Sequence, residues 1–398
     1  MQRNSKFIYR LKIENVTYIF ISSLLFCCVL QASLIGYANE ALASLIYSIS
    51  LILRLILVVC WLLSKPIYNK KEFVGICVFL ILTLISYISI GSLTLFDLFF
   101  IALGYKELEY EKVINCFIRG ILFGLIMVVL LNYKGIIPTY STFRYGTNTM
   151  RNSFGFSHPN VTGRMLLYLC MLWILKRKKK IKIIEICIMF IVAYWIYIFP
   201  NSITASLMII MLIVAVLISK GYNYLFNREF VTNRLVRWGS MILIPTVFIL
   251  TFYLVTNSEN HSVIADISET FYSRFWGGLY AIQQYSINLF GNKIQMIGAA
   301  ERYFGKTIQS YFTIDCLYVL LPVKYGIIVT LYIIYRISDS IKSALHFKQT
   351  YLLIVLIVML IYSFAENGLT LFYSSFVFVC ASCIKNGGEK VGKSNPDR

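Results

Sequence analysis

Charged residues are scarce in this sequence. Asp, Glu, Lys and Arg together make up 14% of the 398 residues, whereas apolar residues make up 59%. Soluble domains hold about 25% charged and about 45–50% apolar residues. A water-soluble fold of this length would have no interior for the surplus, so the composition excludes a soluble globular protein and predicts one embedded in a bilayer.

Histidine and paired acidic residues are also scarce. The chain has three histidines, His158, His261 and His346, and the last falls on the predicted inner side. No Asp-x-Asp pair lies in a predicted outer loop, which counts against a glycosyltransferase that holds a diphosphate through a divalent metal. Most of the ten cysteines lie inside apolar runs, where they act as small hydrophobic residues. We therefore expect no metal site and no cofactor.

Apolar runs long enough for a membrane helix recur along the whole chain. They predict an all-α, polytopic helical bundle of about twelve transmembrane helices, forming a single membrane domain over residues 1–398. Transmembrane β-strands are not the alternative, because the runs are continuous, whereas barrel strands alternate. The fourth and sixth runs are short, and the fourth fits a tilted or re-entrant piece. The predicted spans are residues 16–37, 41–63, 73–90, 93–105, 113–132, 161–175, 183–199, 203–219, 238–256, 315–335, 350–365 and 368–384.

The excess of positive charge predicts the orientation of these spans. The formal net charge is +19, which in a soluble protein would suggest nucleic acid. Here most of the 37 basic residues fall in alternate short loops, as cytoplasmic loops do, so we expect both termini in the cytoplasm and no nucleic-acid partner. The basic start before the first apolar run predicts an uncleaved first span. Arg119 falls inside the fifth span, close enough to the inner face for its side chain to reach it.

Two connections are much longer than the others, and both fall on the predicted external face. They cover residues 133–160 and residues 257–314. Long loops are usually functional or disordered. These two are rich in aromatic residues, glycine and arginine, so we expect them to be folded. Within the second loop, residues 267–290 carry aromatic residues at helical spacing, which predicts a helix lying at the outer interface.

Basic residues in the outer loops oppose the general charge bias and are the first candidates for function. The basic residues in these loops are Arg144, Arg151, His158, Arg274, Lys293, Arg302 and Lys306, with Arg164 and Lys324 at the loop edges. Pro159 and Asn160 predict a helix start with Asn160 as its cap. A helix N-terminus beside arginines suits an anion such as phosphate. The alternative is ordinary capping, with the arginines at the lipid head groups.

Acidic and aromatic candidates lie at the predicted external ends of the last three spans. Asp315 and Tyr318 begin the tenth span, and Glu366 lies in the turn between the last two. An acid in the position of Asp315 could orient or deprotonate a hydroxyl group, or it could cap the helix. Glu366 could contact a substrate or belong to an ordinary polar turn.

Four short motifs in this part of the chain resemble one known family. The string Arg151-Asn-Ser-Phe-Gly-Phe-Ser-His158-Pro-Asn160 resembles the GF-x-HPN signature of Wzy-type polymerases of Gram-positive capsular and exopolysaccharide repeat units, in the O-antigen polymerase and ligase-like superfamily. Three weaker matches follow within the resemblance, which covers roughly residues 144–330. They are Asn201-Ser-Ile-Thr-Ala205, Arg274-Phe-Trp276 with Asn288-Leu-Phe-Gly291, and Asp315-Cys-Leu-Tyr318 with Gly326. Two positions depart from the family pattern, because Ile203 replaces its arginine and Cys316 replaces its asparagine.

The resemblance implies a GT-C-like membrane glycosyltransferase. Such an enzyme works at the outer face of the bacterial cytoplasmic membrane and joins undecaprenyl-diphosphate-linked repeat units without a metal. The surrounding lipid, a flippase and a chain-length regulator would be its partners. The open alternatives are an O-antigen-ligase-like transferase and a transporter or flippase of lipid-linked sugars.

The resemblance also implies roles for the candidate residues. Arg151, Arg274, Arg164 and Arg144 would bind the diphosphate. Either His158 or Asp315 would handle the proton of the acceptor hydroxyl. The other residues that would contact the substrate are Asn160, Tyr318 and Glu366.

Overall fold

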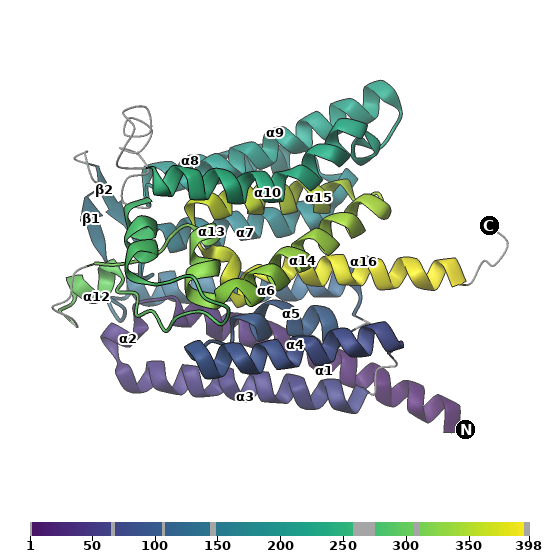
Figure 1. Ribbon diagram of the computed structural model, residues 1–398, viewed down its shortest axis with the longest axis horizontal. Coiled ribbons are helices and arrows are strands. Elements are labelled where there is room, and N and C mark those ends of the chain that lie inside the picture. The colour runs from purple at the N-terminus through teal and green to yellow at the C-terminus, as the bar shows by residue number, and fades with distance from the viewer. Residues whose placement is uncertain are drawn as a thin grey trace. The chain divides into compact units, whose positions relative to one another are not determined.

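The structure is a computed structural model of the chain. It describes residues 2–64, 68–105, 108–143, 149–257, 275–305 and 311–393; the side chains of residues 2–13 and 388–393 are not described. Within these residues the protein is built almost wholly of helices, as predicted (Figure 1). Seven of the described helices are long and apolar enough to cross a membrane, judged by length and composition, with the stretch Leu317–His346 counted as one helix. The protein is therefore an all-α membrane protein, and the total of twelve crossings and the cytoplasmic termini stay predictions.

The helices follow the predicted spans closely. The first nine, in chain order, are α1 (Gln2–Gln31), α2 (Ile35–Ala38), α3 (Glu40–Ser64), α4 (Lys70–Ile90), α5 (Thr94–Gly104), α6 (Tyr110–Tyr133), α7 (Pro159–Arg177), α8 (Ile183–Ile198) and α9 (Ile203–Phe226). Those that follow are α10 (Arg234–Thr256), a helical stretch over residues 275–284, α12 (Ala299–Tyr303), α13 (Leu317–Leu320), α14 (Gly326–His346), α15 (Thr350–Ala365) and α16 (Phe376–Lys393). The expectation that the fourth span is short is confirmed, since the 11 residues of α5 rise only about 16 Å. The sixth span is longer than predicted, because α7 has 19 residues.

The last part of the sequence differs from prediction in two places. The predicted tenth span is broken, because a π-helical turn over Leu321–Tyr325 separates α13 from α14. Pro322 lies in this turn and lacks the N–H group that a regular helix needs. The predicted twelfth span begins late, because Gly368–Thr370 and Phe372–Ser374 form 3-10 turns before α16. Both interruptions lie in apolar sequence, so hydropathy alone does not detect them.

The chain divides into two compact units. Unit 1 comprises residues 1–70, 101–213 and 389–398, and unit 2 comprises residues 71–100 and 214–388. The long outer loop of residues 133–160 belongs to unit 1, and the described residues of the 257–314 loop belong to unit 2. Each unit thus carries one of the two loops that the sequence marks for function.

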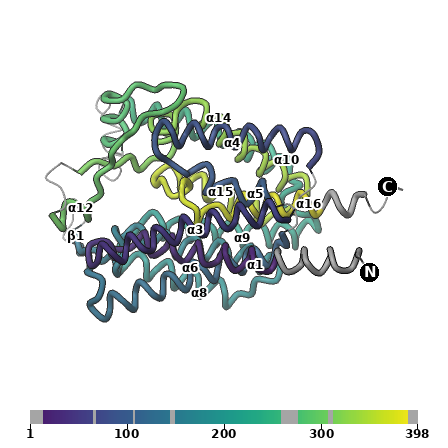
Figure 2. The backbone as a smooth tube through the Cα atoms, turned by 90° about the horizontal axis from the view of Figure 1, so that it is seen from below, coloured from purple at the N-terminus to yellow at the C-terminus, as the bar shows by residue number. Residues whose placement is uncertain are grey.

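Close helix packing organises unit 1. There α1 packs on α3 and on α6, and Figure 2 shows α1 running alongside α6. Gly120 and Gly124 permit this approach, since a Cβ on Gly124 would lie 2.7 Å from the Cβ of Val29, and one on Gly120 would lie 2.8 Å from the carbonyl oxygen of Ser22. Small residues four apart allow membrane helices to approach closely. Gly120 and Gly124 therefore form the surface of α6 that packs on α1.

In unit 2, α10 packs on the broken helix pair α13 and α14 and on α15. The core of this unit is strongly apolar, and α15 is buried along almost its whole length. Tyr318 and Tyr362 are among its largest fully buried side chains. This packing fixes the positions at which the segments carrying Asp315 and Glu366 emerge from the helices.

Candidate functional site

The first outer loop contains a small β-hairpin that the sequence did not predict. Strand β1 (Ser141–Phe143) pairs antiparallel with β2 (Met150–Asn152), and Thr142 lies opposite Arg151 (Figure 1). Beyond the strands, the backbone N–H of Ser153 donates to the carbonyl of Tyr140 at 3.1 Å. The hairpin fixes the backbone from which the Arg151 side chain extends. Residues 144–148 lie outside the described residues, and with them Arg144.

Gly155 and Phe156 of the first motif pack the loop against the neighbouring helices. Gly155 has a φ of +87°, and a Cβ there would lie 2.8 Å from the Cβ of Asn132 at the end of α6. The carbonyl of Gly155 accepts a hydrogen bond from the N–H of Leu34 at 2.8 Å. Phe156 is fully buried. A residue with a side chain could not adopt this conformation in this space. The structure therefore explains why the motif has glycine at position 155.

His158 is the N-cap of α7, a role that the sequence analysis assigned wrongly to Asn160. Its Nδ1 accepts a hydrogen bond from the backbone N–H of Asn160 at 3.1 Å, and Pro159 occupies the first helical position. Proline suits that position because the helix needs no N–H group there. A neutral imidazole whose Nδ1 accepts a hydrogen bond carries its proton on Nε2. In this arrangement Nε2 is a hydrogen-bond donor.

Arg151 joins two motifs that are distant in the sequence. Its Nη2 donates to Oδ1 of Asn160, and its Nε donates to the carbonyl oxygen of Pro200 at 3.3 Å. Pro200 directly precedes the second motif, which begins at Asn201. The side chains of Arg151, His158 and Asn160 are all half-buried. The guanidinium is thus oriented at the positive end of α7, an arrangement that can bind an anion.

Arg164 is a buried residue of α7, not a residue of the loop itself. It belongs to the second turn of α7, and only 7% of its surface is exposed. Its neighbour Gly163 lies against α9, because a Cβ there would be 2.7 Å from the side chain of Ser202. The close packing of α7 on the start of α9 brings the two motifs of unit 1 together and buries Arg164.

The corresponding segment of unit 2 begins at Asp315, which is half-buried. The N-cap of α13 is Cys316, so the alternative reading of Asp315 as the helix cap is wrong. Tyr318 is fully buried, and its hydroxyl donates to the carbonyl oxygen of Leu360 at 2.6 Å. Its ring packs edge-on against Phe248, with ring centroids 4.6 Å apart. This geometry favours a packing role for Tyr318 over contact with a substrate.

Two glycines of the motifs in unit 2 meet backbone to backbone. A Cβ on Gly326 would lie 2.6 Å from the carbonyl oxygen of Leu289, and a Cβ on Gly291 would lie 2.7 Å from the carbonyl carbon of Tyr325. The N–H of Ile327 donates to the carbonyl of Asn288 at 3.0 Å. The Asn288–Gly291 turn is therefore docked onto the break between α13 and α14, which explains why both motifs carry glycine.

Glu366 is the C-cap of α15 and is only 4% exposed. The adjacent Asn367 donates through Nδ2 to the carbonyl oxygen of Ile314 at 3.1 Å. This bond ties the turn at Glu366 to the segment that carries Asp315. The two acidic residues therefore belong to one local arrangement, in which Asp315 is the more exposed.

The candidate residues thus fall into two sets, one in each unit. Arg151, His158 and Asn160 form a hydrogen-bonded cluster in unit 1, whereas Asp315, Tyr318 and Glu366 belong to unit 2. Arg274 lies outside the described residues. The described part of the chain holds no group of three or more His, Cys, Asp or Glu residues arranged to bind a metal ion.

Sequence reasoning missed the elements that hold the unit 1 cluster in place. The carbonyl of Pro200 carries no side-chain signal, and the hairpin strands are only three residues long. The glycine pair on α6 could have been found, because the Gly120-x-x-x-Gly124 spacing is a known sign of close helix packing.

In comparisons with known proteins, no family model, no curated protein and no solved structure matches this chain.

Proposed function

We propose that this protein is a glycosyltransferase that polymerises undecaprenyl-diphosphate-linked oligosaccharide repeat units into capsular or exopolysaccharide at the outer face of the bacterial cytoplasmic membrane. The observation that carries the proposal is the bonded cluster of Arg151, His158 and Asn160 at the start of α7. These are the residues of the most specific motif, and they lie against the start of the second motif through Pro200.

The leaving group of this reaction is a lipid diphosphate, whose negative charge grows as the glycosidic bond breaks. A planar guanidinium can donate two parallel hydrogen bonds to phosphate oxygens. The positive end of α7 adds to the same field. Because Asn160 and Pro200 already orient Arg151, little reorganisation is needed when the charge develops. In this mechanism a guanidinium and a helix end hold the diphosphate, and no metal ion takes part.

The acceptor hydroxyl needs a group that accepts its proton or orients it. The Nδ1 of His158 is engaged as the helix cap, and Nε2 then carries the proton. His158 is consequently better suited to donate a hydrogen bond to a phosphate or sugar oxygen than to act as a base. Asp315, a half-buried residue of unit 2, stays the other candidate for accepting that proton.

The test is elongation in vitro. Purified protein in lipid would be given undecaprenyl-diphosphate-linked repeat units in the presence of EDTA, and the products separated on a gel. We expect a ladder of chains that differ by one repeat unit. Failure to form a ladder, with the cognate repeat unit confirmed present, would contradict the proposal. Transfer of finished glycan without a new length distribution would indicate ligation, and movement of lipid-linked sugar without elongation would indicate transport.

A further inference from the structure

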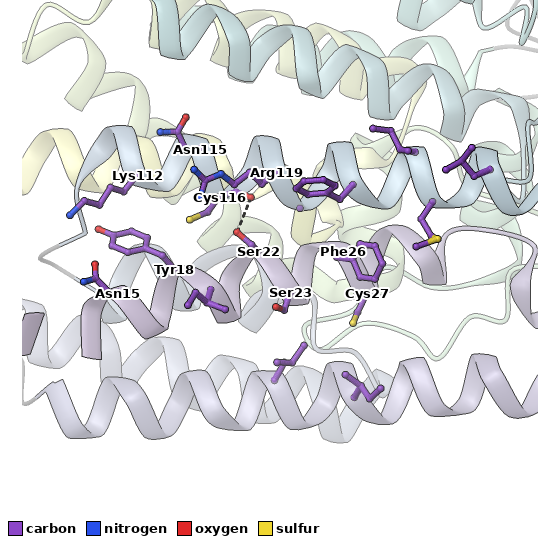
Figure 3. Close-up of a pocket in the computed structure, with 18 residues that line it drawn as sticks. Asn15, Tyr18, Ser22, Ser23, Phe26, Cys27, Lys112, Asn115, Cys116 and Arg119 are labelled. Atoms are coloured by element: carbon purple, nitrogen blue, oxygen red, sulfur yellow. Dashed lines mark hydrogen bonds between the residues drawn. The ribbon is translucent and has the colours of Figure 1, made fainter. Parts of the chain in front are cut away.

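A long groove runs along the packed helices of unit 1. It has a volume of about 970 Å³ and lies between α1, α3 and α6 (Figure 3). Its base is formed where α1 and α6 touch, and there the Ser22 hydroxyl donates to the carbonyl oxygen of Cys116 at 3.2 Å. The contact through Gly120 and Gly124 keeps this base narrow.

One end of the groove is polar. It is lined by Asn15 and Tyr18 from α1 and by Lys112 and Asn115 from α6, as Figure 3 shows. The Lys112 ammonium lies 2.7 Å from the carboxylate of Glu109 and 5.8 Å from the centre of the Tyr18 ring. Lys112 and Glu109 are both well exposed, so their ion pair is weak and leaves the ammonium accessible to another anion.

Arg119 lies deeper along the same groove. It is seven residues beyond Lys112, or about 10 Å along the axis of α6. Its side chain is exposed, and it makes no hydrogen bond or ion pair with any residue that the structure describes. Figure 3 shows the guanidinium extending back toward the Lys112 end, as helical side chains tend to do. A charge at this depth of a membrane helix is costly unless it meets an anion or water.

The other end of the groove is apolar and open. Phe123, Ile126, Met127 and Leu130 extend the α6 wall, and each has at least 41% of its surface exposed. Phe26 faces them from α1. The groove therefore changes along its length from cationic and hydrogen-bonding to mainly apolar, which is the chemical pattern of a lipid with an anionic head and a hydrocarbon tail.

We propose that this groove is a binding site for one anionic phospholipid of the surrounding bilayer. The lipid phosphate accepts hydrogen bonds from Arg119 and Asn115, with Lys112 adding positive charge. One acyl chain lies along the apolar wall of α6 beyond Gly120. The residues that hold the phosphate lie toward the start of α6, whereas the motif loop packs on its end through Gly155, and the proposal does not depend on the polymerase function.

Retention of lipid by the purified full-length protein tests this site. Protein in detergent would be mixed with phosphatidylglycerol or with phosphatidylcholine of the same acyl chains, and bound lipid counted by native mass spectrometry. We expect the wild type to retain phosphatidylglycerol preferentially. Arg119→Gln should weaken that retention at least about tenfold, since a charge-assisted hydrogen bond is lost. Lys70→Gln, at the exposed start of α4, is the matched control and should behave as the wild type.

A second variant tests the tail end of the site without changing charge. Ser23 lines the groove and is half-exposed, so Ser23→Phe should fill it and reduce retention of phosphatidylglycerol at least about fivefold, because the chain loses apolar contact. The elution volume on size exclusion would confirm that each variant is folded. Equal retention of the two lipids by the wild type, or undiminished phosphatidylglycerol retention in folded Arg119→Gln, would overturn the proposal. If Arg119→Gln does not fold, undiminished retention in Ser23→Phe would overturn it.

Discussion

The two units hold their motifs in different ways. In unit 1 the motif residues are half-buried polar side chains that bond to one another, as Arg151 does with Asn160. In unit 2 the motif residues are mostly buried, with Gly291 and Gly326 in backbone contact and Tyr318 inside the core. The comparison shows that the motif residues have different structural roles in the two units. The first motif of unit 1 orients polar side chains, whereas most residues of the unit 2 motifs determine the backbone packing near Asp315.

Arg151→Ala should give the largest effect, and should lower the rate far more than the stability. Removing a preorganised donor to developing charge costs about 10²–10³-fold in rate. We expect initial elongation rates to fall by that factor, while loss of the hydrogen bonds to Asn160 and Pro200 lowers the free energy of unfolding by only about 1–2 kcal/mol, measured by thermal unfolding in detergent. Lys134→Ala, an exposed lysine at the end of α6 in the same unit, is the control and should elongate normally. A normal rate for Arg151→Ala would contradict the proposal that Arg151 stabilises the charge of the leaving diphosphate.

Gly326→Ala should affect the fold of unit 2 instead. The φ of +84° and the 2.6 Å approach of the Leu289 carbonyl oxygen leave no space for a methyl group. We expect the free energy of unfolding to fall by about 3 kcal/mol. The measurement is thermal unfolding in detergent, with Gly221→Ala as the control, since a Cβ at Gly221 meets nothing within 4 Å. Equal stability of the two variants would mean that the turn at Asn288 is not docked on α14.

Two substitutions of His158 separate capping from chemistry. His158→Ala should lower the free energy of unfolding by about 1 kcal/mol, because the N-cap acceptor is lost. His158→Asn should retain that stability, since asparagine is a good cap, yet both variants should elongate more slowly than the wild type. Normal elongation by His158→Asn would reduce His158 to a structural cap.

Tyr318→Phe should give the smallest effect and should leave the rate unchanged. The variant loses the hydrogen bond to the Leu360 carbonyl but keeps the buried ring. We expect a loss of about 1 kcal/mol in the free energy of unfolding. Elongation per folded molecule should match that of the wild type. A large drop in rate at normal stability would show that the Tyr318 hydroxyl reaches the substrate.

The sequence predicted the helices well because hydropathy reports burial in lipid directly. It could not predict the break at Leu321–Tyr325, where apolar residues continue through Pro322, or the three-residue strands beside Arg151. At the candidate site it predicted the helix start but chose the wrong cap. The choice failed because capping propensity favours asparagine, whereas the extended backbone at His158 (φ −156°, ψ 147°) lets its imidazole reach the N–H of Asn160.

Binding of the diphosphate itself tests the account most directly. The affinity of the purified protein for undecaprenyl diphosphate would be measured in detergent with EDTA, for the wild type, Arg151→Gln and Lys134→Gln. We predict that Arg151→Gln binds at least about tenfold more weakly, because a guanidinium–phosphate hydrogen bond is lost, and that Lys134→Gln binds as the wild type does. Equal affinity of all three proteins would contradict the assignment of the α7 start as the diphosphate site.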